Sequence, residues 1–167
     1  MSRYQNNPEH QQGLTLIELL IVMILVGMLT SWGVSQWHHY QQALRLEQTA
    51  QQLLAFLTRL QADANWHNRN ALLWFRPGEA WCVGSGPQAV ACTAAAGRAF
   101  IPEFPDVELQ GFTQKEVGFY GVRNNAQAGH ILLGNQAGRI RLVISAKGRL
   151  RLCSEVTASG SLPLCQP

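Results

Sequence analysis

A glutamate inside an apolar segment is the residue of this sequence that most needs a chemical explanation. Residues 14–33 read LTLIELLIVMILVGMLTSWG and carry one charge, that of Glu18. About 20 such residues are what a helix needs to cross the hydrocarbon core of a bilayer. A carboxylate only five residues into the span costs on the order of 3 kcal/mol on insertion scales. We therefore expect Glu18 either to pair with a cation or to reach the membrane edge.

A second set of charged residues lies near the C-terminus and is suited to binding phosphate. Two arginine pairs alternate with apolar residues in RIRLVIS at 139–145 and RLRLC at 149–153. A strand places alternate side chains on one face, so the two runs predict a hairpin with one basic face. The other interpretation is an ordinary solvated face whose apolar partners fill the core. The candidate phosphate-binding residues are Arg139, Arg141, Lys147, Arg149 and Arg151.

A long helix must position Glu18. Small and apolar residues recur at helical spacing well beyond the apolar span. They are Leu46, Ala50, Leu53, Leu57, Leu60 and Ala64. No proline interrupts residues 14–66, so we expect one helix whose second half packs on a globular head. The alternative is a membrane anchor followed by a separate amphipathic helix.

The remaining residues have the composition of a β-rich head. After Asn70 the chain breaks into short apolar or alternating runs separated by Gly, Pro and Asn. The predicted strands are 71–76, 80–84, 106–111, 117–120, 130–134, 139–145 and 149–153. Residues 84–105, rich in Ala, Gly and Pro, are expected to be a loop. The expected fold class is α+β, with a long N-terminal helix on a C-terminal β-rich head.

The chain has 167 residues, 47% of them hydrophobic, and a net charge of +3. These values fit one modest domain, and an excess of three charges does not by itself indicate a nucleic-acid-binding protein. The sequence has no G-x-S-x-G, H-E-x-x-H or phosphate-loop motif, so we expect no enzyme activity and no cofactor. His38 and His39 fit membrane-interface residues, and His67 near Asp63 fits a cation at a helix end.

Gly13, followed by LTLIE and a long apolar helix, resembles the prepilin signature of type IV pilins and type II secretion pseudopilins. The resemblance implies a leader, residues 1–13, that a prepilin peptidase removes after Gly13 in the cytoplasm. The new N-terminal residue, Leu14, would be methylated, and Glu18 would pair with the N-terminal amine of a neighbouring subunit. It also implies a transmembrane helix over 14–34, its periplasmic continuation over 35–67 and a head over 68–167.

The C-terminal half carries a second resemblance. GFYGVRNN at 118–125, AGHILLGNQAGRIRLVIS at 128–145 and SAKGRLRLC at 145–153 are similar to the GspH/FimT group of minor pilins and pseudopilins. This implies a minor pilin anchored in the inner membrane and later placed at the pilus tip. Its expected partners are prepilin peptidase, other minor pilins, the major pilin and membrane lipid. The alternatives are a type II secretion pseudopilin and a DNA-binding pilin, since G-R-x-R resembles a DNA-contacting pattern of FimT-like pilins.

The four cysteines are interpreted from the compartment that this resemblance implies. A periplasmic head lies in an oxidising environment, where disulfides form. Four cysteines allow three connectivities. We favour Cys82 with Cys92 and Cys153 with Cys165, because each pairing closes a short, glycine-bearing connection. A zinc site is the poorer interpretation, because no C-x-x-C or paired Cys/His spacing is present, and no metal is expected.

Overall fold

The computed structural model describes residues 15–88, 92, 99–121, 125–156 and 162–166, except the side chains of residues 32–35. The proposed cleavage site, Gly13 and Leu14, lies outside the described residues. The chain divides into an N-terminal unit that ends at Trp37 and a second unit, His38–Pro167. The two units are described separately below.

One helix, α1, runs from Leu16 to Trp66, so the alternative of two separate helices is wrong. Thr15 precedes the helix and accepts backbone hydrogen bonds from Glu18 and Leu19 through its carbonyl oxygen, at 3.1 and 3.2 Å. The absence of proline from this part of the sequence lets the ladder of backbone hydrogen bonds continue through 51 residues. At the other end, Asn68 adopts a positive φ of 47°, which ends the helical path before the first strand begins at Ala71.

Within the second unit, α1 buries the stripe that the spacing predicted. Leu46, Ala50 and Leu53 are at most 3% exposed. Leu57 and Ala64 continue the stripe at 0% exposure, with Leu60 packed against the same core. The buried hydroxyl of Thr49 donates to the Arg45 carbonyl at 2.8 Å, so this polar group is satisfied inside the helix.

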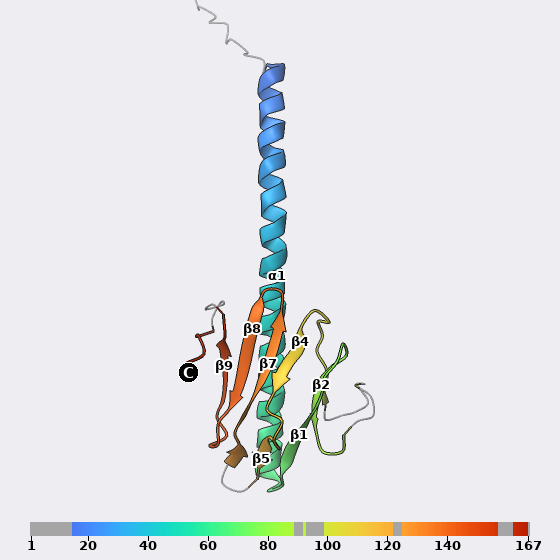
Figure 1. Ribbon diagram of the computed structural model, residues 1–167, viewed down its shortest axis with the longest axis vertical. Coiled ribbons are helices and arrows are strands. Elements are labelled where there is room, and N and C mark those ends of the chain that lie inside the picture. Colours follow the sequence, from blue (N-terminus) through green and yellow to red (C-terminus); the bar gives the residue numbers. More distant parts are fainter. Residues whose placement is uncertain (1–14, 89–91, 93–98, 122–124, 157–161, 167) are drawn as a thin grey trace, which may run out of the picture. The chain divides into compact units, whose positions relative to one another are not determined.

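Two antiparallel sheets pack with this part of α1 (Figure 1). The five-stranded sheet has the order β3-β2-β1-β5-β6 and the four-stranded sheet has the order β4-β7-β8-β9. The strands are β1 (Ala71–Arg76), β2 (Cys82–Ser85), β3 (Ala99–Phe100), β4 (Glu108–Phe112), β5 (Gly118–Tyr120), β6 (Asn125–Gln127), β7 (Gly129–Asn135), β8 (Gly138–Ile144) and β9 (Leu150–Ser154). One long helix with antiparallel sheets confirms the predicted α+β class.

Two strands were not predicted. β3 lies in the segment 84–105 that was expected to be a loop, and its two residues pair with Val83 and Gly84 of β2. β6 pairs with β5 through three residues. The predicted strand 80–84 is also shifted, because the structure places β2 at Cys82–Ser85 and thus partly inside the expected loop. The other predicted strands are present, with ends that differ by two residues at most.

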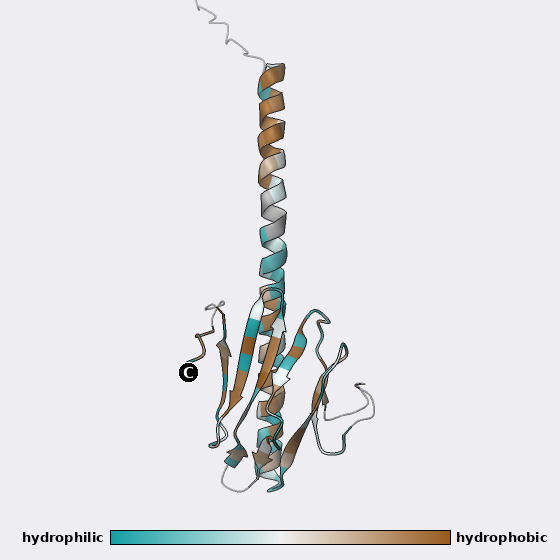
Figure 2. Ribbon diagram, in the orientation of Figure 1, coloured by the Kyte–Doolittle hydropathy of each residue, from teal (hydrophilic) through white to brown (hydrophobic). Residues whose placement is uncertain are grey.

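The core of the second unit lies between α1 and the inward faces of the sheets. Alternate residues of β7 and β8 point inward and are at most 2% exposed; they are Ile131, Leu133, Ile140, Leu142 and Ile144. Figure 2 shows hydrophobic bands alternating with hydrophilic ones along β8. Burial of each such side chain contributes about 1.5–3 kcal/mol. The alternation therefore fixes which face of the hairpin meets the helix and which meets solvent.

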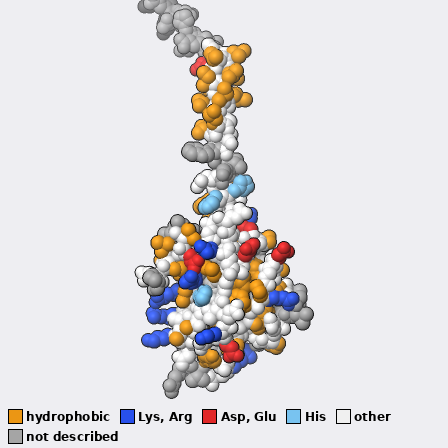
Figure 3. Space-filling view, in the orientation of Figure 1, with side chains coloured by type: hydrophobic (Ala, Val, Ile, Leu, Met, Phe, Trp, Pro, Cys, Tyr) orange, Lys and Arg blue, Asp and Glu red, His pale blue; other side chains and the backbone are white. Residues whose placement is uncertain are grey.

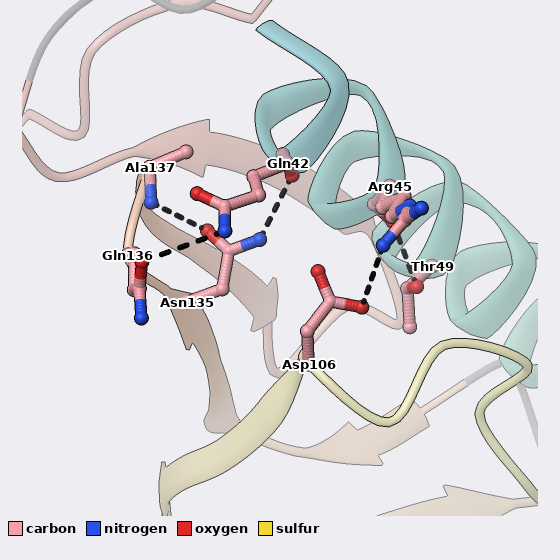
Figure 4. Close-up of polar contacts among 7 residues, drawn as sticks. All are labelled: Gln42, Arg45, Thr49, Asp106, Asn135, Gln136 and Ala137. Atoms are coloured by element: carbon pink, nitrogen blue, oxygen red, sulfur yellow. Dashed lines mark hydrogen bonds and ion pairs between the residues drawn. The ribbon is translucent and has the colours of Figure 1, made fainter. Parts of the chain in front are cut away.

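Polar contacts fix how α1 is aligned along the sheets on which it packs (Figure 4). The amide nitrogen of Asn135 donates to the Gln42 carbonyl at 2.8 Å, where the β7–β8 turn meets α1. The Arg45 guanidinium lies 3.7 Å from the Asp106 carboxylate and 5.6 Å from the Phe104 ring centre. Farther along the helix, the Gln61 side chain donates to the Gly148 carbonyl at 2.8 Å. These contacts hold α1 against the β7–β8 turn, the segment before β4 and the β8–β9 turn.

Candidate assembly site and basic surface

Glu18 stands in the first turn of α1. The hydroxyl oxygen of Thr15 accepts a hydrogen bond from the Glu18 backbone N–H at 3.4 Å, so Thr15 caps the helix. Thr15 and Glu18 have the T-x-x-E spacing of a capping box. The positive end of the helix dipole also favours a carboxylate here. The sequence interpretation missed this role, although the spacing alone was enough to find it.

The surroundings of Glu18 are apolar and exposed. Leu16, Ile17 and Leu19 are each more than half exposed. By length and composition, α1 is the one helix among the described residues that could cross a membrane. The Glu18 carboxylate makes no hydrogen bond or ion pair with a described residue. In a membrane such a carboxylate is costly unless it pairs with a cation or reaches the membrane edge, and no described residue supplies the cation.

The basic residues of β8 and β9 lie on the outward face of the four-stranded sheet. In β8, Arg139 and Arg141 alternate with the buried Ile140 and Leu142. In β9, Arg151 is exposed and lies opposite Val143. Lys147 and Arg149 stand in and beside the hairpin turn, where Gly148 has a φ of +70° that favours glycine. The structure therefore brings all five predicted basic residues onto one hairpin.

Glu155 changes the charge of this surface. Its carboxylate lies 3.6 Å from the Arg139 side chain and also binds Arg141. Of the five candidate phosphate-binding residues, these two are paired with an acid, because the chain leaving β9 brings Glu155 beside them. Lys147, Arg149 and Arg151 make no ion pair with a described residue. The three of them form what we term the basic turn.

Two disulfides tie down loops of the second unit. Cys82 of β2 is joined to Cys92, with their Cα atoms 5.8 Å apart. Cys153 of β9 is joined to Cys165, with Cα atoms 4.9 Å apart. These are the two pairings that the short connections favoured. The second bridge holds the C-terminal segment beside β9, where Leu164 forms a parallel bridge with Ser154.

The histidines have structural surroundings. The His67 ring nitrogen lies 3.0 Å from the Asp63 carboxylate, which Arg69 also binds at 2.6 Å, so the end of α1 carries a small charge cluster. The His130 ring nitrogen Nδ1 and the Thr113 hydroxyl share a hydrogen bond of 3.1 Å. His38 and His39 are exposed on α1. Figure 3 shows histidine side chains in pale blue, and Lys and Arg side chains gathered along one side of the displayed face of the second unit.

Comparison with known proteins adds one family motif. Residues 9–34 match the model of the prokaryotic N-terminal methylation motif. A solved structure, the type IV minor pilin FimU of Pseudomonas aeruginosa strain PAO1, is similar with a TM-score of 0.49 and 17% sequence identity. That alignment covers 68% of this chain and 99% of FimU. No curated protein sequence matches the chain. The segment that places Glu18 at the start of an exposed apolar helix thus matches a prokaryotic N-terminal methylation motif.

Proposed function

We propose that this chain is a minor pilin that helps to initiate or cap assembly of a type IV pilus. The observation that carries the proposal is the exposed Glu18 carboxylate, unpaired among the described residues, in the first turn of an exposed apolar helix. That residue lies inside the matched methylation motif. A helix of this kind is suited to packing against other apolar helices rather than to catalysis.

Processing supplies the cation that Glu18 lacks. Prepilin peptidase would cut after Gly13, and the new amine on Leu14 would be methylated. A methylated amine still carries a positive charge, so it can pair with the Glu18 carboxylate of a neighbouring subunit. Because water is excluded between the helices, the attraction is stronger there than at an exposed surface. Each incoming subunit would in this way be held at a defined height relative to its neighbour.

The second unit supplies the specific contacts. It would lie in the periplasm while the subunit is in the inner membrane, and at the pilus tip after assembly, in contact with other minor pilins and the major pilin. The C-terminal pattern supports the GspH/FimT group. DANWHNR at 63–69 and AWC at 80–82 are similar to enterobacterial prepilin peptidase-dependent protein A. A type II secretion pseudopilin of the GspH type has the same design and is the alternative.

Deletion of this chain tests the proposal. A strain that makes the major pilin but lacks this chain is expected to show far fewer surface fibres, because initiation is lost while the pool of major pilin stays in the membrane. The fibres are counted by electron microscopy, and plasmid-encoded wild-type chain should restore them. Normal fibre numbers in a deletion strain that has no redundant minor pilin would contradict the assignment.

DNA binding is the second candidate, and the basic turn favours it. Lys147, Arg149 and Arg151 are exposed and make no ion pair with a described acid, so they are available to phosphates. Arg139 and Arg141 are less available because Glu155 binds both. The two arginine pairs have the same sequence pattern, but in the structure only the first pair is bound by an acid.

Because Glu155 binds one arginine pair and not the other, the two pairs can be compared in a DNA-binding experiment. The protein used is residues 38–167, which have a core of their own. If the surface binds DNA, the protein should retard double-stranded DNA at low salt. Arg149→Ala with Arg151→Ala should abolish binding or lower the salt slope by about 2, roughly one for each phosphate contact. Arg139→Ala with Arg141→Ala should have the smaller effect. Absence of retardation at low salt would remove this candidate.

A further inference from the structure

We propose that the free edge of β9, with the groove between β9 and α1, binds an extended, carboxylate-bearing segment of a neighbouring subunit of different sequence. That the partner is a neighbouring subunit rests on the proposed function. The edge, the groove and their charge are features of the second unit alone. β9 is the outermost strand of the four-stranded sheet, as Figure 1 shows, so one side of its backbone has no strand partner within that sheet.

The direction of the backbone groups follows from the hydrogen bonds around β9. The Ser145 N–H donates to the Arg149 carbonyl, and the Glu155 N–H donates to the Arg139 carbonyl, each at 3.0 Å. In an antiparallel pair the bonded positions alternate with unbonded ones. Residues 149, 151 and 153 therefore direct their backbone groups to β8. The backbone groups of Leu150, Leu152 and Ser154 point to the free edge.

The C-terminal segment occupies part of this edge. The Ser154 N–H donates to the Pro163 carbonyl, and the Cys165 N–H donates to the Ser154 carbonyl, each at 2.9 Å. In continued parallel pairing, the next bond would join the Leu152 carbonyl to the N–H of residue 163. That residue is Pro163, which has no N–H. The Leu150 and Leu152 carbonyls accordingly accept no hydrogen bond from a described residue.

A groove runs beside the open part of the edge. It is shallow and open, with a volume of about 630 Å³. Apolar side chains from three parts of the chain meet in it, since Leu54 comes from α1, Leu152 from β9 and Leu162 from the C-terminal segment. The remaining lining residues come from the exposed face of α1; they are Gln51, Ala55, Thr58 and Arg59. An extended segment that pairs with β9 can place an apolar side chain here.

The charge of the groove indicates which kind of segment binds in it. Arg59 lines the groove and makes no ion pair with a described residue. Arg149 and Arg151 lie on the outward face of the sheet and do not line the groove, and no lining residue is acidic. A carboxylate on the bound segment would therefore meet the positive side chain of Arg59. A second copy of this chain is a poorer match, because each copy carries a net charge of +3.

Pairing with an exposed sheet edge is a general way of recognising an extended peptide. Main-chain hydrogen bonds provide affinity, and pockets for alternate side chains provide specificity. Here the outward carbonyl of Leu150 and the outward N–H of Leu152 offer the bonds, the three leucines of the groove receive one apolar side chain, and Arg59 selects a carboxylate. This combination makes the β9 edge, rather than the outward face of the sheet, the expected contact with a neighbouring subunit.

Site-specific photo-cross-linking of the full chain in cells that make its partner pilins tests the inference. Benzoylphenylalanine replaces Ala55, which is exposed in the groove, or Gln127, which is also exposed, on β6 of the other sheet. We expect Ala55 to link to another subunit, at a peptide that mass spectrometry shows to contain Asp or Glu beside an apolar residue. The yield at Gln127 should be lower.

Two pairs of variants separate charge from strand pairing. Arg59→Glu should lower the Ala55 adduct at least about fivefold, whereas Arg59→Lys should keep it. Leu152→Pro should lower it more than Leu152→Ala, because both remove the leucine side chain but only proline also removes the outward N–H. A non-reducing gel that shows intact disulfides verifies folding of each variant.

The inference is overturned by an adduct with a second copy, by equal yields at Ala55 and Gln127, or by a yield that Arg59→Glu leaves unchanged. It is also overturned if the processed, assembled chain gives no Ala55 adduct, and in that case the proposed function survives. If the chain keeps residues 1–13 and never enters a fibre, the proposed function fails instead, whatever Ala55 contacts.

Discussion

Glu18→Val is expected to leave membrane insertion intact and to reduce fibre number by more than about 100-fold. The variant removes the carboxylate but keeps an apolar side chain, so the helix inserts at least as well as before. In the assembly, the amine of the neighbouring subunit then loses its partner. Removing one member of a buried ion pair costs about 3–5 kcal/mol, and each 1.4 kcal/mol corresponds to a factor of ten in the equilibrium.

The measurement is fibre counting by electron microscopy, with membrane fractionation to verify insertion. Leu20→Val is the matched control, because it places the same valine side chain in the same exposed apolar surface and retains Glu18. Glu18→Asp keeps the charge on a shorter side chain and should give an intermediate number. Wild-type fibre numbers for Glu18→Val, in a strain without redundant minor pilins, would show that the carboxylate has no part in assembly.

Gly13→Val should prevent processing and thereby remove the chain from fibres altogether. A peptidase must bring its catalytic groups close to the backbone at the bond that it cuts, and glycine, which lacks a Cβ, permits this approach. A branched side chain at the same position obstructs it. The expected result is a chain that keeps residues 1–13 in the membrane, seen as slower gel mobility and by N-terminal sequencing.

The control for this variant is Gln12→Val, which places the same side chain one residue earlier and should be cut normally. Both positions belong to the matched methylation motif, which begins at residue 9. Efficient removal of the leader from Gly13→Val would mean that glycine is not required there.

The helix and its buried face could be predicted from the sequence because the residue pattern that determines them lies within one continuous segment. The 3.6-residue period of the stripe from Leu46 to Ala64 needs no knowledge of the rest of the chain. The hairpin of β8 and β9 was accessible for the same reason, since strict alternation and the turn at Gly148 lie within a short segment. Both features were therefore predicted with nearly correct boundaries.

The short strands depend on distant partners. β3 has two residues in an Ala-, Gly- and Pro-rich segment, and its pairing with Val83 and Gly84 is what makes it a strand. β6 is three residues long and exists by pairing with β5. Neither has enough residues to show a period of two, so no pattern in the sequence could distinguish them from loop.

Among the candidate sites too, those with a local sequence signal could be predicted and those formed by distant segments could not. Glu18 was evident because a lone carboxylate is conspicuous in an apolar run. The pairing of Glu155 with Arg139 and Arg141 was not evident, because the contact requires β9 to return beside β8 and bring an acid 14 to 16 residues away in the chain next to them. The groove at β9 combines residues of α1, β9 and the C-terminal segment, and it exists only in the folded chain.

The intact mass of the wild-type chain, extracted from membranes that contain active prepilin peptidase, shows whether proteolysis creates the amine that Glu18 needs. We expect a chain that begins at Leu14, is heavier by one methyl group and is lighter by four hydrogens for the two disulfides. The Gly13→Val chain measured alongside should keep its leader. A wild-type chain that retains Met1 would contradict the claim that proteolysis creates the cation with which Glu18 pairs.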